Sequence, residues 1–368
     1  MDRTVLIRDV LEVPARCLGQ SMDEAFDRLY DSLFGGVSPN LEDFREAALK
    51  YFDTVSGDST RQDEYFVCFT PVWNFYLADG KRGDAEGLWR LALDPVLLWQ
   101  NANPGQFIHK GTAYYFWAMT ALLQGGIDRG YILMHQAFAE DCRTSGNPRP
   151  YTPAFAFVSL ESDEPNQAFK DWVQEQARFL DGFVKDYSAT FSRPFTIDEF
   201  RKRYLRNPPV IDAVFQLTHT MARLWDIGKL PEESRQNPFV GQIQLNLLFD
   251  LLLLIDNAIS HKSGQWKFFD HVIFLLNHTP HPILQSDLQD INRQLNTSFD
   301  ATLSAALAGS LAANGKSLDR LQCDVIVAYG LRNRGAHEIE NVPIILNAID
   351  DTQRAIFRAF IGVVDLLY

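Results

Sequence analysis

Apolar residues recur every three or four positions along most of the chain, which is the spacing of an amphipathic helix. The pattern is clearest from Phe169 to Val184, where charged residues fill the positions between the apolar ones. Segments that alternate with period two are scarce, so the sequence predicts an all-α fold. The same spacing predicts further helices over residues 41–54, 111–123, 131–141, 210–227, 239–260, 301–313, 318–331 and 344–367.

A helix-start signal follows residue 195. Thr196 and Glu199 have the spacing of a capping box, in which each side chain accepts a hydrogen bond from the other residue's backbone N–H. Phe195 and Phe200 flank this box as a hydrophobic staple. We therefore expect a helix to begin here.

Two connectors, residues 143–153 and 228–239, are rich in residues that break helices. The second precedes the most apolar helix of the chain, and we place the main domain boundary there. The sequence thus predicts a helical, repeat-like regulatory or binding region over residues 1–235 and a helical bundle over residues 236–368.

The segment 111–141 predicts a helical hairpin. Its small residues Ala118, Gly130 and Ala137 would let two antiparallel helices approach closely. This arrangement resembles one tetratricopeptide unit, although no second copy follows at that period. An ordinary helical hairpin is the alternative interpretation.

Composition and charge narrow the function classes. The 368 residues carry a net charge of −13, which argues against a protein that coats nucleic acid through bulk charge. The cysteines are dispersed, so neither a disulfide framework nor a zinc ribbon is predicted and a reducing compartment is expected. Asp250 and Asp256 interrupt the most apolar stretch, residues 245–259, which we interpret as a buried helix rather than a membrane span. The N-terminus lacks the apolar core of a secretory signal, and we expect a cytoplasmic protein.

The segment 327–340 carries the strongest indication of chemistry. Arg332 and Asn333 are followed by His337, with four residues between the arginine and the histidine. This pattern resembles the catalytic Arg-x4–6-His motif of the HEPN superfamily of ribonucleases. The resemblance covers residues 236–368 and implies a small helical bundle that dimerises, with Arg332, His337 and Asn333 as catalytic residues.

These residue types suit RNA cleavage without a metal ion or other cofactor. RNA supplies its own nucleophile, the 2′-hydroxyl. A histidine can transfer protons near neutral pH, and an arginine fork matches phosphate oxygens. The products implied by the resemblance are a 2′,3′-cyclic phosphate and a 5′-hydroxyl. Arg334 is a further candidate for binding the RNA backbone, although a surface salt bridge is the alternative for it.

Helix geometry limits how the motif can work. Residues five apart in a regular helix point about 140° from each other, so Arg332 and His337 would not face one phosphate. We expect Gly330 and Gly335 to distort the helix, or a homodimer to bring two copies of the motif into one composite site. Asn333 would orient the pair. The structural alternative is that Arg332 and Arg334 pair with nearby acids while His337 caps the helix.

Other polar residues give weaker signals. His278 and His281 lie close in sequence, but too few ligands surround them for a metal site, and we interpret this segment as a solvated loop. Asp256 could support the catalytic cleft or could simply lie solvated near a helix end. The isolated histidines His109, His135 and His219 are interpreted as structural.

The sequence supports two candidate functions. The first is a metal-independent endoribonuclease, by analogy a toxin or an antiviral-defence effector, whose N-terminal region binds a protein or small-molecule regulator. The second is a non-catalytic dimeric helical scaffold that recruits a protein or nucleotide partner. An intact set of Arg332, Asn333 and His337 favours the first.

Overall fold

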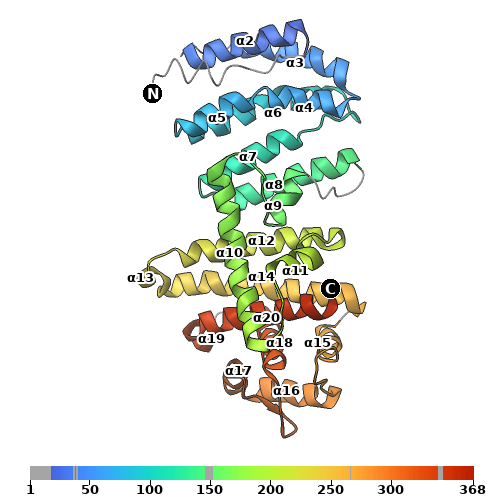
Figure 1. Ribbon diagram of the computed structural model, residues 1–368, viewed down its shortest axis with the longest axis vertical. Coiled ribbons are helices and arrows are strands. Elements are labelled where there is room, and N and C mark those ends of the chain that lie inside the picture. The colour runs from blue at the N-terminus through green and yellow to red at the C-terminus, as the bar shows by residue number, and fades with distance from the viewer. Residues whose placement is uncertain (1–17, 36–37, 39, 146–151, 266, 339–342) are drawn as a thin grey trace. The chain divides into compact units, whose positions relative to one another are not determined.

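The computed structural model describes residues 18–35, 38, 40–145, 152–265, 267–338 and 343–368, except that the side chains of residues 335–338, 343 and 344 are not described. These residues form two compact units (Figure 1). Unit 1 comprises residues 1–156 and 163–169, and unit 2 comprises residues 157–162 and 170–368. The predicted all-α fold is confirmed, because helices account for nearly all regular structure in these residues.

Unit 1 is a succession of helices, most of which pack against the next helix, while α3 also packs against α6 and α4 against α7. Its centre is a cluster of buried aromatic side chains, in which Phe26, Tyr65 and Phe69 contact one another. The buried Tyr65 hydroxyl donates to the carbonyl of Ala92. Its helices are α2 (Gln20–Gly35), α3 (Leu41–Val55), α4 (Ser59–Val67), α5 (Thr70–Ala78), α6 (Arg82–Ala102), α7 (Gly111–Leu123), α8 (Ile127–Ser145) and most of α9 (Pro153–Val158).

The predicted hairpin of residues 111–141 is formed by α7 and α8, which pack closely along their length. Gly130 of α8 lies directly against Leu122 of α7, and a Cβ atom at position 130 would overlap the Leu122 side chain. A glycine therefore sets how closely the two helices approach. Whether the hairpin is a tetratricopeptide unit stays a prediction.

Unit 2 is built around α14 (Pro238–Ser263), which packs against α12, α15, α18, α19 and α20. Figure 1 shows α14 and α20 side by side. The other elements are α10 (Gln167–Phe191), α11 (Ile197–Phe200), the π-helix η1 (Arg201–Leu205), the 3-10 turn η2 (Pro208–Val210), α12 (Ile211–Gly228), α13 (Glu232–Arg235), α15 (Phe268–Leu276), α16 (Gln285–Thr297), α17 (Phe299–Leu307), β1 (Ala312–Ala313), β2 (Lys316–Ser317), α18 (Arg320–Glu338), α19 (Pro343–Asn347) and α20 (Ile349–Leu367).

The division between the units differs from the predicted boundary at residue 236. The units divide between residues 156 and 170, so α12 and nearly all of α10 belong with the C-terminal bundle. The physical reason is packing, because α12 lies along α14. In addition, Arg358 of α20 bonds Asp186 of α10 at 3.0 Å.

The predicted capping box is present. The backbone N–H of Glu199 donates to Thr196 Oγ1 at 3.2 Å, and the N–H of Thr196 donates to the Glu199 carboxylate at 2.9 Å. Two predicted helices are partly wrong: residues 344–367 are divided at Ala348 between α19 and α20, and residues 301–313 do not form a single helix. Helix α17 ends at Leu307, and Ala312–Ala313 pairs with Lys316–Ser317 in a short antiparallel hairpin.

Helix α14 is the one helix in the described residues whose length and hydropathy would allow it to cross a membrane. It is also the central helix of unit 2, and its buried residues include Leu247, Leu251, Leu254 and Ile255. Helices of the same chain therefore cover these apolar residues, as the sequence predicted for a buried helix. Leu253 is the exception within this stretch, with 52% of its surface exposed.

Candidate functional site

Arg332 lies on α18 and faces α14 and α15. Its Nη2 atom donates to Oδ2 of Asp256 at 3.2 Å. Its guanidinium carbon lies 5.1 Å from the centroid of the Phe268 ring, within the range of a cation–π contact. The side chain keeps 36% of its surface exposed. The guanidinium is therefore held on one side while part of it stays open to solvent.

Asp256 also binds a buried histidine. Its Oδ1 atom lies 2.5 Å from Nδ1 of His271, and Nε2 of His271 lies 3.0 Å from the carbonyl oxygen of Gln265. Both ring nitrogens thus face acceptors, and each such contact needs an N–H donor. Asp256 therefore contacts His271 through one carboxylate oxygen and Arg332 through the other.

The role of Asp256 was left open by the sequence, and the contact with Arg332 decides it against simple solvation near a helix end. Asp256 lies within α14, and its side chain is 19% exposed. His271 was missed altogether, since a single histidine on α15 has no distinctive spacing relative to Arg332. Only the packing of α14, α15 and α18 brings these three side chains together.

Asn333 and Arg334 face a different neighbour. They line a cavity of about 320 Å³ between α16, α17 and α18, together with Asn292, Leu295, Asn296, Phe299 and Gly330. The guanidinium carbon of Arg334 lies 4.4 Å from the centroid of the Phe299 ring. Arg332 is not among the described residues that line this cavity. The structure therefore separates Arg332 from the two residues that follow it.

The Asn333 side chain has a partner on its own helix, α18. It hydrogen-bonds the phenol of Tyr329. The Tyr329 hydroxyl in turn donates to Oδ1 of Asn292 at 3.2 Å. Burial raises the pKa of Tyr329, and the hydrogen bond with Asn333 partly opposes that rise. The orienting role of Asn333 stays a prediction, and Asp256 is the residue that contacts Arg332.

His337 belongs to the last turn of α18, and its side chain lies outside the described part of the structure. Helix α18 continues through Gly330 and Gly335 to Glu338, so the expected interruption at these glycines is wrong. Gly330 instead serves packing, because a Cβ atom there would lie 3.0 Å from Cδ2 of Leu295. In a regular helix the Cα atoms of residues 332 and 337 are about 140° apart around the axis.

A cap and a buried ion pair position α18. Asp319 accepts from the N–H of Gln322 at 2.8 Å, and Gln322 Oε1 accepts from the N–H of Asp319 at 2.9 Å. These two reciprocal hydrogen bonds form a capping box at the start of α18. Two turns before Arg332, the fully buried Asp324 binds Arg358 of α20 at 2.7 and 3.0 Å. Burial raises the pKa of Asp324, and the hydrogen bonds and charge of Arg358 oppose that rise.

No group of three or more His, Cys, Asp and Glu side chains in the described residues is placed to hold a metal ion. His278 and His281 lie on an exposed connector after α15, and Nδ1 of His278 contacts the carbonyl of Phe274 at 2.8 Å. The described parts of the site are a held arginine, the carboxylate and histidine behind it, and a nearby polar cavity.

The chain matches no protein-family model, no curated protein and no solved structure.

Proposed function

We propose that unit 2 is a metal-independent endoribonuclease of the HEPN type, which cleaves RNA by attack of the 2′-hydroxyl on the adjacent phosphate. The observation that carries the proposal is the setting of Arg332. Asp256 and Phe268 hold its guanidinium on one side, and about a third of the side chain remains open. A guanidinium held in this way is preorganised to bind a phosphate through its free N–H groups.

The proposed chemistry divides the work between two residues. Arg332 stabilises the charge that develops on the phosphate oxygens in the transition state. His337 transfers the proton of the 2′-hydroxyl or the proton of the leaving 5′-oxygen. Residues five apart in a regular helix point about 140° from each other, so the proposal includes a homodimer in which motifs from two chains complete one site. Arg334, beside the 320 Å³ cavity, would bind the RNA backbone.

A non-catalytic scaffold is the second candidate, and one observation favours it. Arg332 already has an acidic partner in Asp256, and a structural role would require no more than that contact. The two candidates differ in whether the remaining exposed part of the guanidinium contacts RNA. Removal of His337 distinguishes them, because a scaffold does not use that side chain for proton transfer.

The experiment incubates the purified chain with mixed RNAs in excess EDTA and analyses the ends of any products. We expect 2′,3′-cyclic phosphate and 5′-hydroxyl ends, and we expect His337→Ala to abolish cleavage while its circular dichroism spectrum stays unchanged. His281→Ala is the matched control, because it removes an exposed histidine elsewhere in unit 2. Wild-type cleavage by His337→Ala, or activity that returns only with magnesium or manganese, would contradict the proposal.

A further inference from the structure

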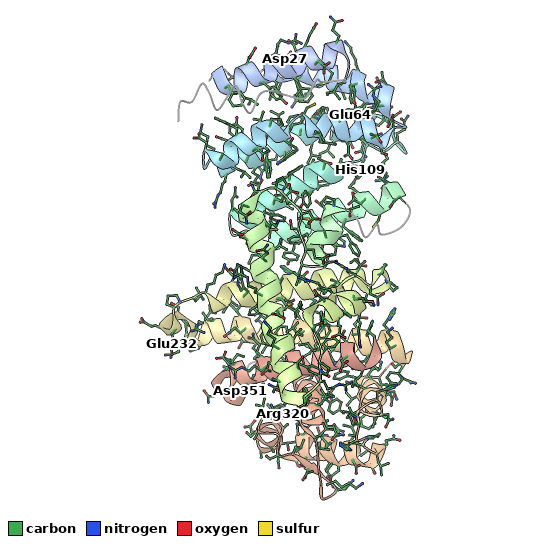
Figure 2. All side chains as sticks on the ribbon, in the orientation of Figure 1. Asp27, Glu64, His109, Glu232, Arg320 and Asp351 are labelled. Atoms are coloured by element: carbon green, nitrogen blue, oxygen red, sulfur yellow. The ribbon has the colours of Figure 1, made fainter. Side chains whose placement is uncertain are left out.

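The cavity of about 320 Å³ between α16, α17 and α18 lies within unit 2, on the helix that carries Arg332. Figure 2 labels Arg320, the residue at which α18 begins. Further along, the same helix supplies Gly330, Asn333 and Arg334 to the cavity. Arg334 is the one charged side chain among the described residues that line it. The cavity thus adjoins Arg332 in sequence and favours a ligand that carries phosphate.

A chain of hydrogen bonds fixes which atoms of two asparagine amides remain available in this cavity. The hydrogen bond from Asn333 acts to lower the pKa of Tyr329 against the effect of burial, and a bond with that effect is donated to the phenol oxygen. Asn333 therefore donates through Nδ2. The Tyr329 hydroxyl donates its single hydrogen to Oδ1 of Asn292 at 3.2 Å. Oδ1 of Asn333 remains as an acceptor, and Nδ2 of Asn292 remains as a donor.

The two remaining groups place a donor beside an acceptor. Neither group hydrogen-bonds another described residue. Both belong to side chains that contact one hydroxyl, that of Tyr329, so a single planar ligand can reach both. A nucleobase carries a matching pair on one edge. Adenine, for example, presents its N6 amino group as a donor beside N7 as an acceptor, which Asn333 and Asn292 would respectively contact.

A planar group lies beside these amides. The guanidinium carbon of Arg334 is 4.4 Å from the centroid of the Phe299 ring, and both residues line the cavity. Unpaired bases stack on aromatic rings and on guanidinium planes. Leu295 lines the same cavity and adds apolar surface. The lining therefore combines amides, a planar group and apolar surface, a combination that contact with a phosphate alone does not need.

We propose that this cavity binds one unpaired nucleobase of the RNA substrate, hydrogen-bonded by Asn292 and Asn333 and stacked on Arg334. The inference rests on the proposed function, which supplies the reason for RNA to lie beside α18. The volume of 320 Å³ is near the lower end of the range of about 300–1,000 Å³ for small-molecule sites, which suits one ring system. The base contact adds to the backbone contact proposed for Arg334 and makes RNA binding depend on the base at this position.

The experiment measures binding alone, so its result does not depend on catalysis. The full chain is titrated, by fluorescence anisotropy, with short 2′-O-methyl homopolymers of A, C and U, which lack the nucleophile for cleavage, and with an abasic oligomer of the same length and charge. We expect at least one homopolymer to bind about fivefold or more tightly than the abasic oligomer. Equal affinity for all of them would show backbone binding alone and would overturn the proposal.

The same titration separates this inference from the proposed function. Base-dependent binding by a chain that cleaves no RNA would support the nucleobase site and contradict the ribonuclease. Cleavage by a chain whose binding is independent of the base would overturn the nucleobase site and leave the ribonuclease in place.

An isosteric variant tests the amide edge. Asn292→Asp keeps the Oδ1 acceptor for Tyr329 and exchanges the Nδ2 donor for an acceptor oxygen. We expect the advantage of the preferred homopolymer over the abasic oligomer to be lost or reduced about fivefold, and the added charge cancels in this ratio. Gln289→Glu makes the same change of charge at an exposed position of α16 that is not among the described lining residues, and it should keep the wild-type ratio.

Circular dichroism confirms that each variant is folded. An unchanged ratio in folded Asn292→Asp would overturn the proposal. If that variant does not fold, the comparison between the homopolymers and the abasic oligomer on the wild type decides it.

Discussion

Arg332 donates a 3.2 Å hydrogen bond to Asp256, a residue that lies 76 positions earlier in the chain. This contact joins α18 to α14, and the same carboxylate binds the buried His271 of α15. The arginine of the proposed catalytic motif is therefore not a free surface cation. Its orientation depends on two helices that precede it in the chain, and this dependence leads to the first two predictions.

Arg332→Lys separates charge from geometry. Lysine keeps the positive charge but loses the planar fork and its paired hydrogen bonds to phosphate. We expect near-normal RNA affinity and single-turnover cleavage slower by about 10²–10³-fold, the usual effect of removing one preorganised donor. Arg354→Lys is the control, because Arg354 is an exposed arginine of α20 with a nearby aspartate. Cleavage within about threefold of the wild-type rate would make Arg332 a docking residue.

Asp256→Asn tests the positioning of Arg332. The asparagine keeps the shape of the side chain, but it removes the charge that holds Arg332 and His271. We expect cleavage to slow by about tenfold or more, with unfolding free energy lower by roughly 1.5–3 kcal/mol, the range for hydrogen bonds to charged groups. Urea unfolding measures the stability, and single-turnover assays at a temperature where the variant is fully folded measure the rate.

Two comparisons make that result specific. Asp300→Asn, which removes an exposed carboxylate from the first turn of α17, should change neither quantity appreciably. The double variant with Arg332→Lys should cleave little more slowly than Arg332→Lys alone, because residues that act together are not additive. A stability loss without any change in cleavage would limit Asp256 to a role in folding.

Assembly is the third prediction. The proposed composite site requires a homodimer through residues 236–368, and light scattering at micromolar concentration should give twice the chain mass. The apolar face of α14 is covered mainly by helices of its own chain, so the expected dimer rests on the sequence spacing of Arg332 and His337 rather than on exposed apolar surface. Full activity in a monomeric sample would rule out the composite site.

The fourth prediction concerns Asp287 and acid stability. Hydrogen bonds from the Asn314 side chain and the Leu284 N–H, together with the charge of Lys316, hold the pKa of Asp287 below its ordinary value. As the pH falls, the unfolded chain therefore binds more protons than the folded chain. The contribution of Asp287 to the free energy of unfolding is complete above about pH 5, and it is lost as the pH falls to the pKa of Asp287 in the folded chain. Asp287→Asn should flatten this loss in urea unfolding measured from pH 6 to pH 2. An equal pH dependence in variant and wild type would contradict the assignment.

The sequence by itself determined the helices, because the signals that specify a helix are local. Apolar spacing located α7, α12 and α14 to within three residues at each end, and the Thr196–Glu199 box marked the start of α11. The error over residues 301–313 was also local in origin. Asn314 and Gly315 have φ values of 47° and 76°, and Asn-Gly is the pair that a tight hairpin turn prefers. The apolar spacing of residues 301–313 favoured a helix, and the Asn-Gly turn signal that follows it was given too little weight.

The tertiary structure alone decided which polar side chains meet. Asp256, His271 and Arg332 lie on three different helices. The apolar periodicity of one helix does not indicate which side chains of another helix it contacts. His109 shows the same limit, since only the packing of unit 1 places it beside Asp63 and Asp141. Burial, charge and hydrogen bonding at a site depend on how helices pack, and packing joins residues that are distant in the chain.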